Sequence, residues 1–311
     1  MDGVLIVDKP AGPTSFDVVR RVRGLGRGRK AGHTGTLDPM ATGVLPVCLG
    51  DATKIASFIT EGDKIYEGVV RLGAVTDTWD ATGTVLEESP IGSLDPAEVE
   101  RAVAAMQGEY WQTPPMYSAV KVGGKRLYEL ARKGEEIERR PRKVKLHSIS
   151  LVAFEPSTGD ATIRVHCSKG TYVRSIAHEL GEALGVGGHL AALRRLQSGP
   201  FSIEQAVPLA VVLEMVAAGR QEELARFVVP MREALAEIPE VLLDEERARK
   251  VAYGMVLGGR DLVASDFPRQ PQGTKVRVTG PGGRLLAVAE QAPGGLRYLR
   301  VMVTPRDLAP A

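Results

Sequence analysis

The chain has 311 residues, of which 43% are hydrophobic and 25% are charged, and its formal net charge at pH 7 is only +2. This composition excludes a wholly disordered protein, and the length is about twice that of a typical domain of roughly 150 residues, so we expect two domains. The longest run without a charged side chain covers residues 39–50, which is too short for a membrane-spanning helix of about 20 residues.

The N-terminal sequence and the cysteines both favour an intracellular protein. The sequence MDGVLIVDKP has an acidic residue at position 2 and no basic region followed by an apolar run, so we expect no secretory signal. Cys48 and Cys167 show neither CxxC nor Cys/His spacing, which predicts buried thiols and neither a disulfide nor a zinc site. We therefore expect a cytoplasmic location.

The first 72 residues alternate between predicted strands and helices. The apolar run GVLIV at 3–7 predicts a strand that leads into the loop sequence DKPAGPTS. A helix is predicted from Thr14 or Ser15 to Arg23, with an apolar face formed by Phe16, Val19 and Val22. The segments that follow are a predicted loop at 24–36, a strand at 44–49, a helix at 52–59 and a strand at 66–72.

The middle of the chain continues this mixed pattern. Asp95-Pro96 predicts the start of a helix that ends at Gln107, because Asp accepts from free first-turn amides and Pro has no amide to leave unpaired. Alternating runs at 143–153 and 161–167 predict paired strands, and apolar spacing at 173–184 predicts a helix. The fold class predicted from these elements is α+β.

A change in composition near Ile238-Pro239 predicts a domain boundary, with domains at 1–238 and 239–311. The second part contains a predicted helix at 244–253, a Gly-Gly turn at 258–259 and two short strands separated by the turn sequence GPGG at 280–283. We expect a small, β-rich domain.

Positive charge is concentrated in two blocks. Residues 18–37 contain six basic residues and no acidic one, and residues 120–145 contain ten basic residues against four Glu. Such blocks suit phosphate contacts with nucleic acid. A solvated helix face would explain the second block equally well, but two blocks on either side of a Gly/Thr loop favour RNA or DNA. The segment 201–239, with three Arg against six Glu, has the charge of ordinary surface.

The sequence RKAGHTGTLDPMATG at 29–43 contains few residues that favour helices or strands. Its glycines permit unusual backbone angles and its threonines can make local hydrogen bonds, which predicts a structured loop that presents one carboxylate, Asp38. An isolated Asp-Pro pair would be interpreted as the start of a turn. Neither a P-loop nor a GxGxxG motif is present, so we expect no nucleotide cofactor.

The motif GHTGTLDPMATGVLP resembles the central motif of the pseudouridine synthases, specifically the bacterial TruB type, which acts on the uridine at position 55 in the T-arm of tRNA. Further stretches occur in the order and spacing of that family: DKPAGPTS, KIYEGVVRLGAVTDTWDATG, PPMYSAVKVGGKRLYELARKG, CSKGTYVRSIAHELG and HLAALRRLQSGPF. The resemblance implies an α+β core with a mixed β-sheet and flanking helices. Residues after 238 resemble a PUA domain, a small RNA-binding β-barrel.

The resemblance implies catalytic roles for three residues. Asp38 matches the essential aspartate, Tyr66 matches the tyrosine that stacks on the target base, and Arg174 matches the arginine that pairs with the aspartate. A uridine in a folded loop must be flipped out of its stack before it can react, and a cation such as Arg174 would oppose the rise in the Asp38 pKa that burial causes. Without the surrounding motifs, strand packing would explain Tyr66 and phosphate binding or capping would explain Arg174.

The implied reaction breaks the C1'–N1 bond of uridine, rotates the uracil and forms a C1'–C5 bond. It involves no net oxidation, hydrolysis or group transfer, so the resemblance implies no metal and no other cofactor. Attack by Asp38 at C1', its attack on the base and its removal of a ribose proton are all compatible with the sequence. Tyr66 could relay the C5 proton if its environment lowered the pKa of the phenol.

Substrate-binding roles are also implied by the resemblance. Lys9 and Pro10 match a motif that supports the loop of the catalytic aspartate, Leu193 matches an apolar residue near the site, and His33 matches a histidine at the RNA interface. The segment 120–145 resembles an insertion that folds onto the T-arm, where we expect phosphate contacts from Lys125, Arg126, Arg140 and Arg142. The expected partner is tRNA, and we expect a monomer that needs neither a guide RNA nor a membrane.

Three alternatives compete with this interpretation. A nucleoside or glycoside hydrolase would pair Asp38 with a second carboxylate about 5 to 9.5 Å away, and Asp77 or Asp80 is the candidate, although turn chemistry in TDTWDATG explains both. A non-catalytic module could remodel tRNA by flipping bases. A guide-RNA-dependent synthase would share the catalytic motif but would need accessory proteins, for which the sequence shows no signature.

Overall fold

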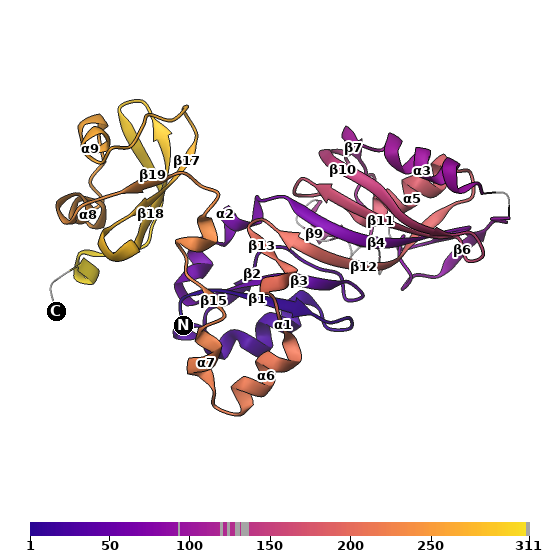
Figure 1. The fold of residues 1–311 in the computed structure, drawn as a ribbon, viewed down its shortest axis with the longest axis horizontal. Coiled ribbons are helices and arrows are strands. Elements are labelled where there is room, and N and C mark those ends of the chain that lie inside the picture. The colour runs from indigo at the N-terminus through magenta and orange to yellow at the C-terminus, as the bar shows by residue number, and fades with distance from the viewer. Residues whose placement is uncertain (93, 119–120, 123–124, 128–130, 132–136, 309–311) are drawn as a thin grey trace.

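The computed structural model describes all residues except 93, 119–120, 123–124, 128–130, 132–136 and 309–311, and the side chains of 121–122 and 125–126 also lie outside the description. Figure 1 shows an elongated body built on one large sheet and a smaller C-terminal lobe, coloured yellow, beside the end of the body that carries the N-terminus. None of the described helices is long and apolar enough to cross a membrane.

Eleven strands of the described chain form the large sheet, whose central path runs β14-β1-β3-β12-β4-β11-β10-β7. Most neighbours are antiparallel, but β1 pairs in parallel with β14 and β3 in parallel with β12, so the sheet is mixed as expected. The strands of this path are β1 (Gly3–Lys9), β3 (Thr42–Leu49), β4 (Lys64–Leu72), β7 (Gly108–Gln112), β10 (Arg142–Glu155), β11 (Asp160–Cys167), β12 (Gly188–Ser198) and β14 (Val207–Pro208).

Smaller strands complete the body. β2 (Ala31–His33) pairs with β3, β13 (Phe201–Ser202) with β12, and β15 (Val228–Val229) with β1. Two separate hairpins are formed by β5 (Ala74–Thr76) with β6 (Val85–Glu88) and by β8 (Lys121–Val122) with β9 (Lys125–Arg126).

Helices cover the sheet in two groups, and each group encloses its own hydrophobic cluster. At the N-terminal end, α1 (Ser15–Val22), α6 (Leu209–Ala217) and α7 (Gln221–Ala225) pack on β1 and β3. At the other end, α3 (Pro96–Ala105) and α5 (Val173–Ala183) pack on β4, β10 and β11. Tyr66 and Leu193 contact both clusters and therefore mark the junction between the two halves of the sheet.

The C-terminal lobe contains a four-stranded sheet in the order β16-β17-β18-β19, with two short helices beside it. Its elements are β16 (Glu240–Leu242), α8 (Glu245–Ala252), α9 (Gly259–Ala264), β17 (Lys275–Thr279), β18 (Leu285–Ala292) and β19 (Gly295–Val301). Leu285, Val288 and Met302 of the lobe share a buried cluster with Val4 and Ile6 of β1. The strands of this lobe are the β-rich element that the sequence predicted, whereas its assignment as a PUA domain stays a prediction.

Most predicted elements are confirmed within a few residues, including the strand at β1, the paired strands β10 and β11, and the helix α5. One residue of the predicted apolar face of α1 is wrong. The side chain of Phe16 faces solvent, and the residue is 68% exposed. The buried residues of α1 are Ser15, Val18, Val19 and Val22, because positions three and four apart share one face of a helix.

Three other predictions need correction. The predicted loop at 24–36 contains the 3₁₀ turns η1 (Arg23–Leu25) and η2 (Arg27–Arg29) and the strand β2. The predicted helix at 52–59 is divided into the 3₁₀ turn η3 (Gly50–Lys54) and α2 (Ala56–Thr60). The C-terminal lobe has four strands where two were predicted: β16 has only three residues, too few to show an alternating pattern, and β19 was also not predicted.

Gly43 allows β3 and β12 to approach each other closely. Its φ is +99°, and a Cβ added there would lie 2.2 Å from the carbonyl oxygen of Arg195. Gly12 has a similar φ of +106°, but an added Cβ would meet nothing within 4 Å. Alanine substitutions at Gly12 and Gly43 therefore separate the energetic cost of backbone strain from that of a steric clash.

We expect Gly12→Ala to destabilise the protein by about 1 to 2 kcal/mol, the usual cost of a left-handed backbone for an L-residue. Gly43→Ala adds a clash with backbone, so its expected cost is about 3 to 5 kcal/mol. Guanidinium unfolding monitored by circular dichroism measures both values. Equal destabilisation by the two variants would contradict the close approach at Gly43.

Candidate active site

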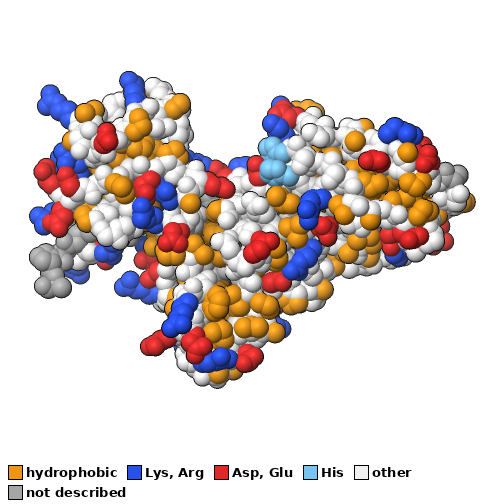
Figure 2. All heavy atoms as spheres, in the orientation of Figure 1, with side chains coloured by type: hydrophobic (Ala, Val, Ile, Leu, Met, Phe, Trp, Pro, Cys, Tyr) orange, Lys and Arg blue, Asp and Glu red, His pale blue; other side chains and the backbone are white. Residues whose placement is uncertain are grey.

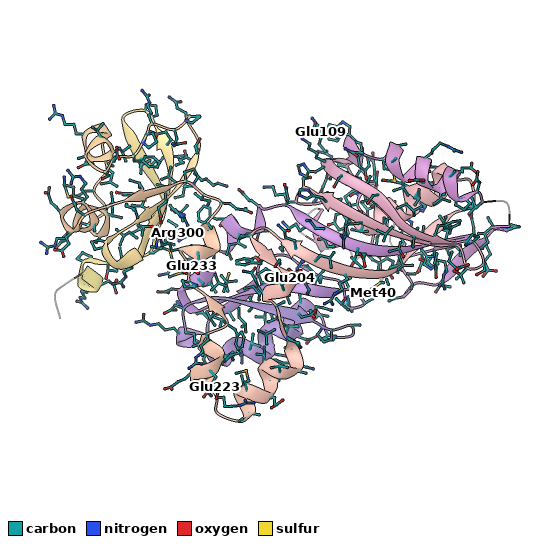
Figure 3. The ribbon with its side chains drawn as sticks, viewed as in Figure 1. Met40, Glu109, Glu204, Glu223, Glu233 and Arg300 are labelled. Carbon is teal, nitrogen blue, oxygen red and sulfur yellow. The ribbon has the colours of Figure 1, made fainter. Side chains whose placement is uncertain are left out.

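Residues 34–41, here called the Asp38 loop, have no helical or strand structure, yet hydrogen bonds fix their backbone. The hydroxyl of Ser15, at the start of α1, accepts a hydrogen bond from the Leu37 amide at 2.8 Å and donates to the Leu37 carbonyl at 3.0 Å. The Ala41 amide donates to the Asp38 carbonyl at 3.1 Å, which closes a tight turn around Asp38. Met40, labelled in Figure 3, marks the place of this loop beside the middle of the large sheet.

Lys9, at the end of β1, anchors the Asp38 loop through hydrogen bonds to its backbone. Its fully buried ammonium donates to the carbonyls of Pro10 at 2.9 Å, Pro39 at 3.1 Å and Ala41 at 2.6 Å. Burial lowers the pKa of Lys9 to about 8; the nearby Asp38 carboxylate opposes this shift and the Arg195 cation adds to it. Lys9 thus bonds directly to the Asp38 loop, whereas the exposed Pro10 contributes its carbonyl to the Lys9 ammonium.

Arg174, in the first turn of α5, contacts the Asp38 carboxylate through two nitrogens. Its Nε lies 3.0 Å from Asp38 Oδ2, and a terminal nitrogen donates to Asp38 Oδ1 at 3.3 Å. The other terminal nitrogen lies 3.5 Å from Asp80 Oδ2. Arg174 also donates to the carbonyls of Thr78 at 3.3 Å and Tyr117 at 2.9 Å. A guanidinium held on every side in this way has one orientation, and that orientation fixes the Asp38 carboxylate.

Asp80 is the second carboxylate of this arrangement, and it is buried. Its Oδ1 accepts from the Thr78 hydroxyl at 2.9 Å, from the Thr82 amide at 2.9 Å and from the Thr82 hydroxyl. Asp77 is exposed and accepts from the Thr84 amide at 2.8 Å, as a turn residue does. Asp80 therefore combines turn formation with a charge contact to Arg174, and its carboxylate is already engaged by that cation and by Thr78 and Thr82.

The electrostatic balance at Asp38 depends on Arg174. Burial raises the pKa of the Asp38 carboxyl, and the Asp80 carboxylate raises it further, while Arg174 and, more weakly, Lys9 lower it. The Asp38 side chain is still 34% exposed, so a substrate can reach it. Removing the guanidinium would leave the carboxyl group beside a second carboxylate and favour its protonated form.

Tyr66, on β4, packs between the two hydrophobic clusters of the body. Burial raises the pKa of its phenol above the usual value, although the Arg195 cation opposes the shift. The phenol therefore stays protonated at neutral pH. This environment argues against Tyr66 as a proton relay.

Arg195 is a site residue that sequence reasoning missed. It is 1% exposed, its Nε donates to the Val44 carbonyl at 2.7 Å, and a terminal nitrogen donates to the Gly35 carbonyl at 3.1 Å. Its neighbour Arg194 points to the other face of β12 and pairs with Asp8 at 2.8 Å. The only sequence signal was the Arg-Arg pair in HLAALRRLQSGPF, and alternation along a strand sends just one of the two inward.

Trp79 was also missed, and it stabilises the loop that carries the other partners of Arg174. Its φ is +60°, an uncommon value for a bulky residue. Its ring stacks on His178 of α5, with centroids 4.2 Å apart, and the guanidinium of Arg139, which precedes β10, lies 5.5 Å from the ring centroid. Contacts with two distant segments thus offset the local strain between Thr78 and Asp80.

The remaining predicted residues lie as follows. His33 is half-buried on β2, burial lowers its pKa, and its Nδ1 has no hydrogen-bond partner among the described residues. Leu193 is half-buried on β12 beside Gly68. Arg140 and Arg142 are exposed near the start of β10. Lys125 and Arg126 form β9, but their side chains lie outside the described residues.

Two family models match the chain. One, described as the TruB family pseudouridylate synthase N-terminal domain, covers residues 23–173, and the other, described as the tRNA pseudouridylate synthase B C-terminal domain, covers residues 174–236. The first ends one residue before Arg174, and the second begins with it. The two matches together therefore include Asp38, Asp80 and Arg174, whereas Lys9 and Ser15 precede the matched residues.

Curated relatives resemble the chain over most of its length. Proteins named tRNA pseudouridine synthase B are 44% identical in Saccharophagus degradans, over 93% of this chain and 92% of the relative, and 45% identical in Solibacter usitatus, over 93% and 96%. A solved Cbf5-Nop10-Gar1 complex contains a chain that is 26% identical, with a TM-score of 0.75 over 99% of this chain and 87% of that one. The archaeal box H/ACA sRNP Nop10-Cbf5 complex has the same fold, with a TM-score of 0.71.

The lowered pKa of Lys9 predicts a specific pH dependence of stability. The native state releases the Lys9 proton near pH 8, whereas the unfolded chain releases it near pH 10.5. The unfolded state therefore binds more protons between these values, and native stability rises with pH there. In Lys9→Met this contribution is absent.

We expect the loss of stability in Lys9→Met to be larger at pH 10 than at pH 7.5 by about 2 kcal/mol. Denaturant unfolding of wild type and variant at both pH values measures this difference. Lys64, whose pKa burial also lowers to about 8, is present in both proteins, so its contribution cancels. A difference that stays constant or shrinks with pH would contradict the buried state of Lys9.

Proposed function

The chain belongs to the TruB family of pseudouridylate synthases, and we propose that it acts on the uridine at position 55 in the T-arm of tRNA, with Asp38 as the catalytic residue. As a tRNA pseudouridine synthase it isomerises uridine to pseudouridine. The observation that carries the proposal for Asp38 is its two-point contact with Arg174, which orients an accessible carboxylate and favours its ionised form.

The reaction requires one group that acts at the glycosidic bond and a pocket that retains the uracil. Cleavage of C1'–N1, rotation of the base and formation of C1'–C5 leave the atoms of the RNA unchanged in number. An ionised Asp38 can serve as nucleophile or as base in this sequence. Arg174 orients the carboxylate and opposes the rise in its pKa that burial causes, and Lys9 holds the loop that presents it.

The uridine reaches Asp38 by base flipping, which costs a few kcal/mol of stacking. We assign Tyr66 to compensate part of this cost by stacking its ring on the flipped uracil. Leu193, which contacts the same two hydrophobic clusters as Tyr66, would supply an apolar wall. His33, on the strand that leads into the Asp38 loop, would contact the RNA next to the flipped base.

Basic side chains would hold the RNA backbone. A groove of about 420 Å³ beside α1 is lined by four of the six cations of the first basic block: Arg20, Arg23, Arg29 and Lys30. Arg140 and Arg142 of the second block are exposed. Recognition of an RNA arm by shape and backbone agrees with this distribution, because side chains read the deep groove of A-form RNA poorly.

We propose that the enzyme works as a monomer, without a guide RNA, in the cytoplasm. The support is that relatives named tRNA pseudouridine synthase B match nearly the whole chain. The Cbf5 complexes share its fold and carry additional protein chains by name. We also propose the division at residue 238, which is supported by the separate sheet of the C-terminal lobe.

The test of Asp38 uses a T-arm stem-loop with tritium at C5 of its target uridine. Wild type should release tritium while the strand keeps its mass apart from the exchanged isotope. Asp38→Asn should lower the release rate by more than about a thousandfold, because it removes the reacting group. Asp77→Asn is the matched control: it also replaces a carboxylate by an amide, but in an exposed turn, and it should behave as wild type.

Free uracil among the products would identify a hydrolase and overturn the isomerase assignment. Equal release by wild type and Asp38→Asn would remove Asp38 from the chemistry. If wild type binds the stem-loop without releasing tritium, either the target uridine differs or the protein only remodels RNA. Full-length tRNA labelled at every uridine distinguishes these two cases.

The contribution of the basic residues is measured by the salt dependence of binding. Each lost phosphate contact lowers the slope of log K against log salt by about 0.7 to 0.9. We therefore expect the double variant Arg140→Ala/Arg142→Ala to lower the slope by about 1.5. Arg220→Ala is the control, because Arg220 is an arginine in the acidic segment 201–239, paired with Glu214. An unchanged slope in the double variant would contradict the phosphate contacts.

A further inference from the structure

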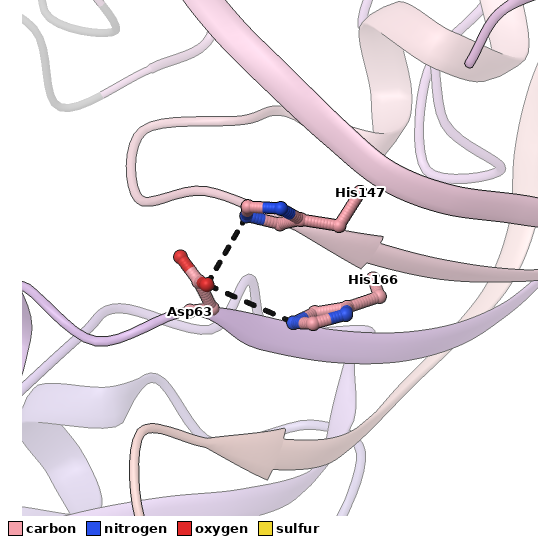
Figure 4. Close-up of side chains that lie close together, drawn as sticks. All are labelled: Asp63, His147 and His166. Carbon is pink, nitrogen blue, oxygen red and sulfur yellow. Dashed lines mark ion pairs between the residues drawn. The ribbon is translucent and has the colours of Figure 1, made fainter. Parts of the chain in front are cut away.

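Asp63, His147 and His166 converge on one point of the surface, away from the Asp38 site. The Oδ2 of Asp63 lies 3.1 Å from Nε2 of His147 and 3.8 Å from Nε2 of His166. One potential ligand atom from each residue lies within 4.8 Å of the other two. Figure 4 shows the carboxylate between the two imidazole rings, and Figure 2 shows a pale-blue histidine patch on the side of the body that faces the C-terminal lobe.

The backbone of the large sheet sets this arrangement. Asp63 immediately precedes β4, His166 lies near the end of β11, and His147 lies on β10, so three adjacent strands supply one residue each. The pairing of β10 with β11 shifts register between Leu146 and Ser148. This irregularity lies at His147 itself and brings its ring to within 4.7 Å of the His166 ring, between centroids.

The donor atoms suit a transition-metal ion. Zinc binds imidazole nitrogen and carboxylate oxygen at about 2.0 to 2.2 Å, so two ligands of a tetrahedral ion lie roughly 3.4 Å apart. The measured separations of 3.1 and 3.8 Å lie on either side of this value. In addition, Nε2 of His147 is buried and makes no well-aligned hydrogen bond with any described residue.

The neighbouring cations do not occupy the site. Lys64 directs its ammonium to the carbonyls of Thr60, at 2.7 Å, and Gly62. Lys169 and Lys275 both pair with Glu61. These lysines therefore bond elsewhere, and the Asp63 carboxylate pairs with His147 and His166.

We propose that Asp63, His147 and His166 bind one divalent cation of the zinc class, with water completing its coordination. The three ligands would join β4, β11 and β10 at one end of the sheet. Lys275, which belongs to β17 of the C-terminal lobe, pairs with Glu61 two residues before Asp63. The bound ion would thus stabilise the part of the body that meets the lobe, and this role is independent of the reaction at Asp38.

The experiment treats the full-length protein with a chelator, removes the chelator and titrates the protein with Zn²⁺ against a chromophoric competitor. Wild type should bind one ion per chain. His147→Gln, His166→Gln and Asp63→Asn should each weaken binding at least about tenfold, because each removes one of three protein ligands. His178→Gln is the matched control: His178 lies 3.6 Å from Glu182 but has no third ligand there among the described residues.

Two further readouts guard against an effect of misfolding. Zn²⁺ should raise the melting temperature of wild type and of His178→Gln but not of the three ligand variants. Co²⁺ should give visible absorption bands in wild type that each ligand variant loses. Absence of stoichiometric binding by folded wild type would reduce the trio to an ion-pair cluster and overturn the proposal. An equal loss of binding in His178→Gln would place the ion elsewhere and overturn it as well.

Discussion

The guanidinium of Arg174 is the interaction on which the arrangement of the site depends. Two carboxylates, those of Asp38 and Asp80, lie on either side of it, and burial alone would push the Asp38 carboxyl toward its neutral form. Together with Lys9 and Arg195, the described site contains three cations for two carboxylates. Of these cations, Arg174 and Lys9 oppose the rise in the Asp38 pKa that burial and the Asp80 carboxylate cause.

Rigidity of the Asp38 loop comes from side chains that precede their partners in the loop by more than twenty residues. The Ser15 hydroxyl and the Lys9 ammonium bond to carbonyls at Leu37, Pro39 and Ala41, and so replace the hydrogen bonds that a helix or strand would provide. Lys9 is itself part of β1, which pairs with β3, β14 and β15 of the large sheet. The loop can therefore contain Gly35, with its φ of +142°, without becoming loose at Asp38.

The sequence allowed prediction of the elements with strong local patterns, and of Asp38, Tyr66 and Arg174 through the resemblance. It did not allow prediction of contacts that only the tertiary structure creates. Alternation along a strand could not tell which of Arg194 and Arg195 points inward, and Trp79 gains its role from segments about 60 and 100 residues away. Likewise, Asp63, His147 and His166 have no motif spacing, because three separate strands bring them together.

Both faces of β1 and β3 are covered, which links the C-terminal lobe to the Asp38 loop. Leu5, Val7, Leu45 and Val47 face the helices α1 and α6, while Val4, Ile6, Val44 and Cys48 face the cluster that includes residues of the lobe. Because neither face of these two strands meets water, their sequences are continuous apolar runs such as GVLIV. β1 ends at Lys9 and β3 begins at Thr42, directly on either side of the loop's anchoring contacts. Packing of the lobe against these strands therefore stabilises the same backbone that presents Asp38.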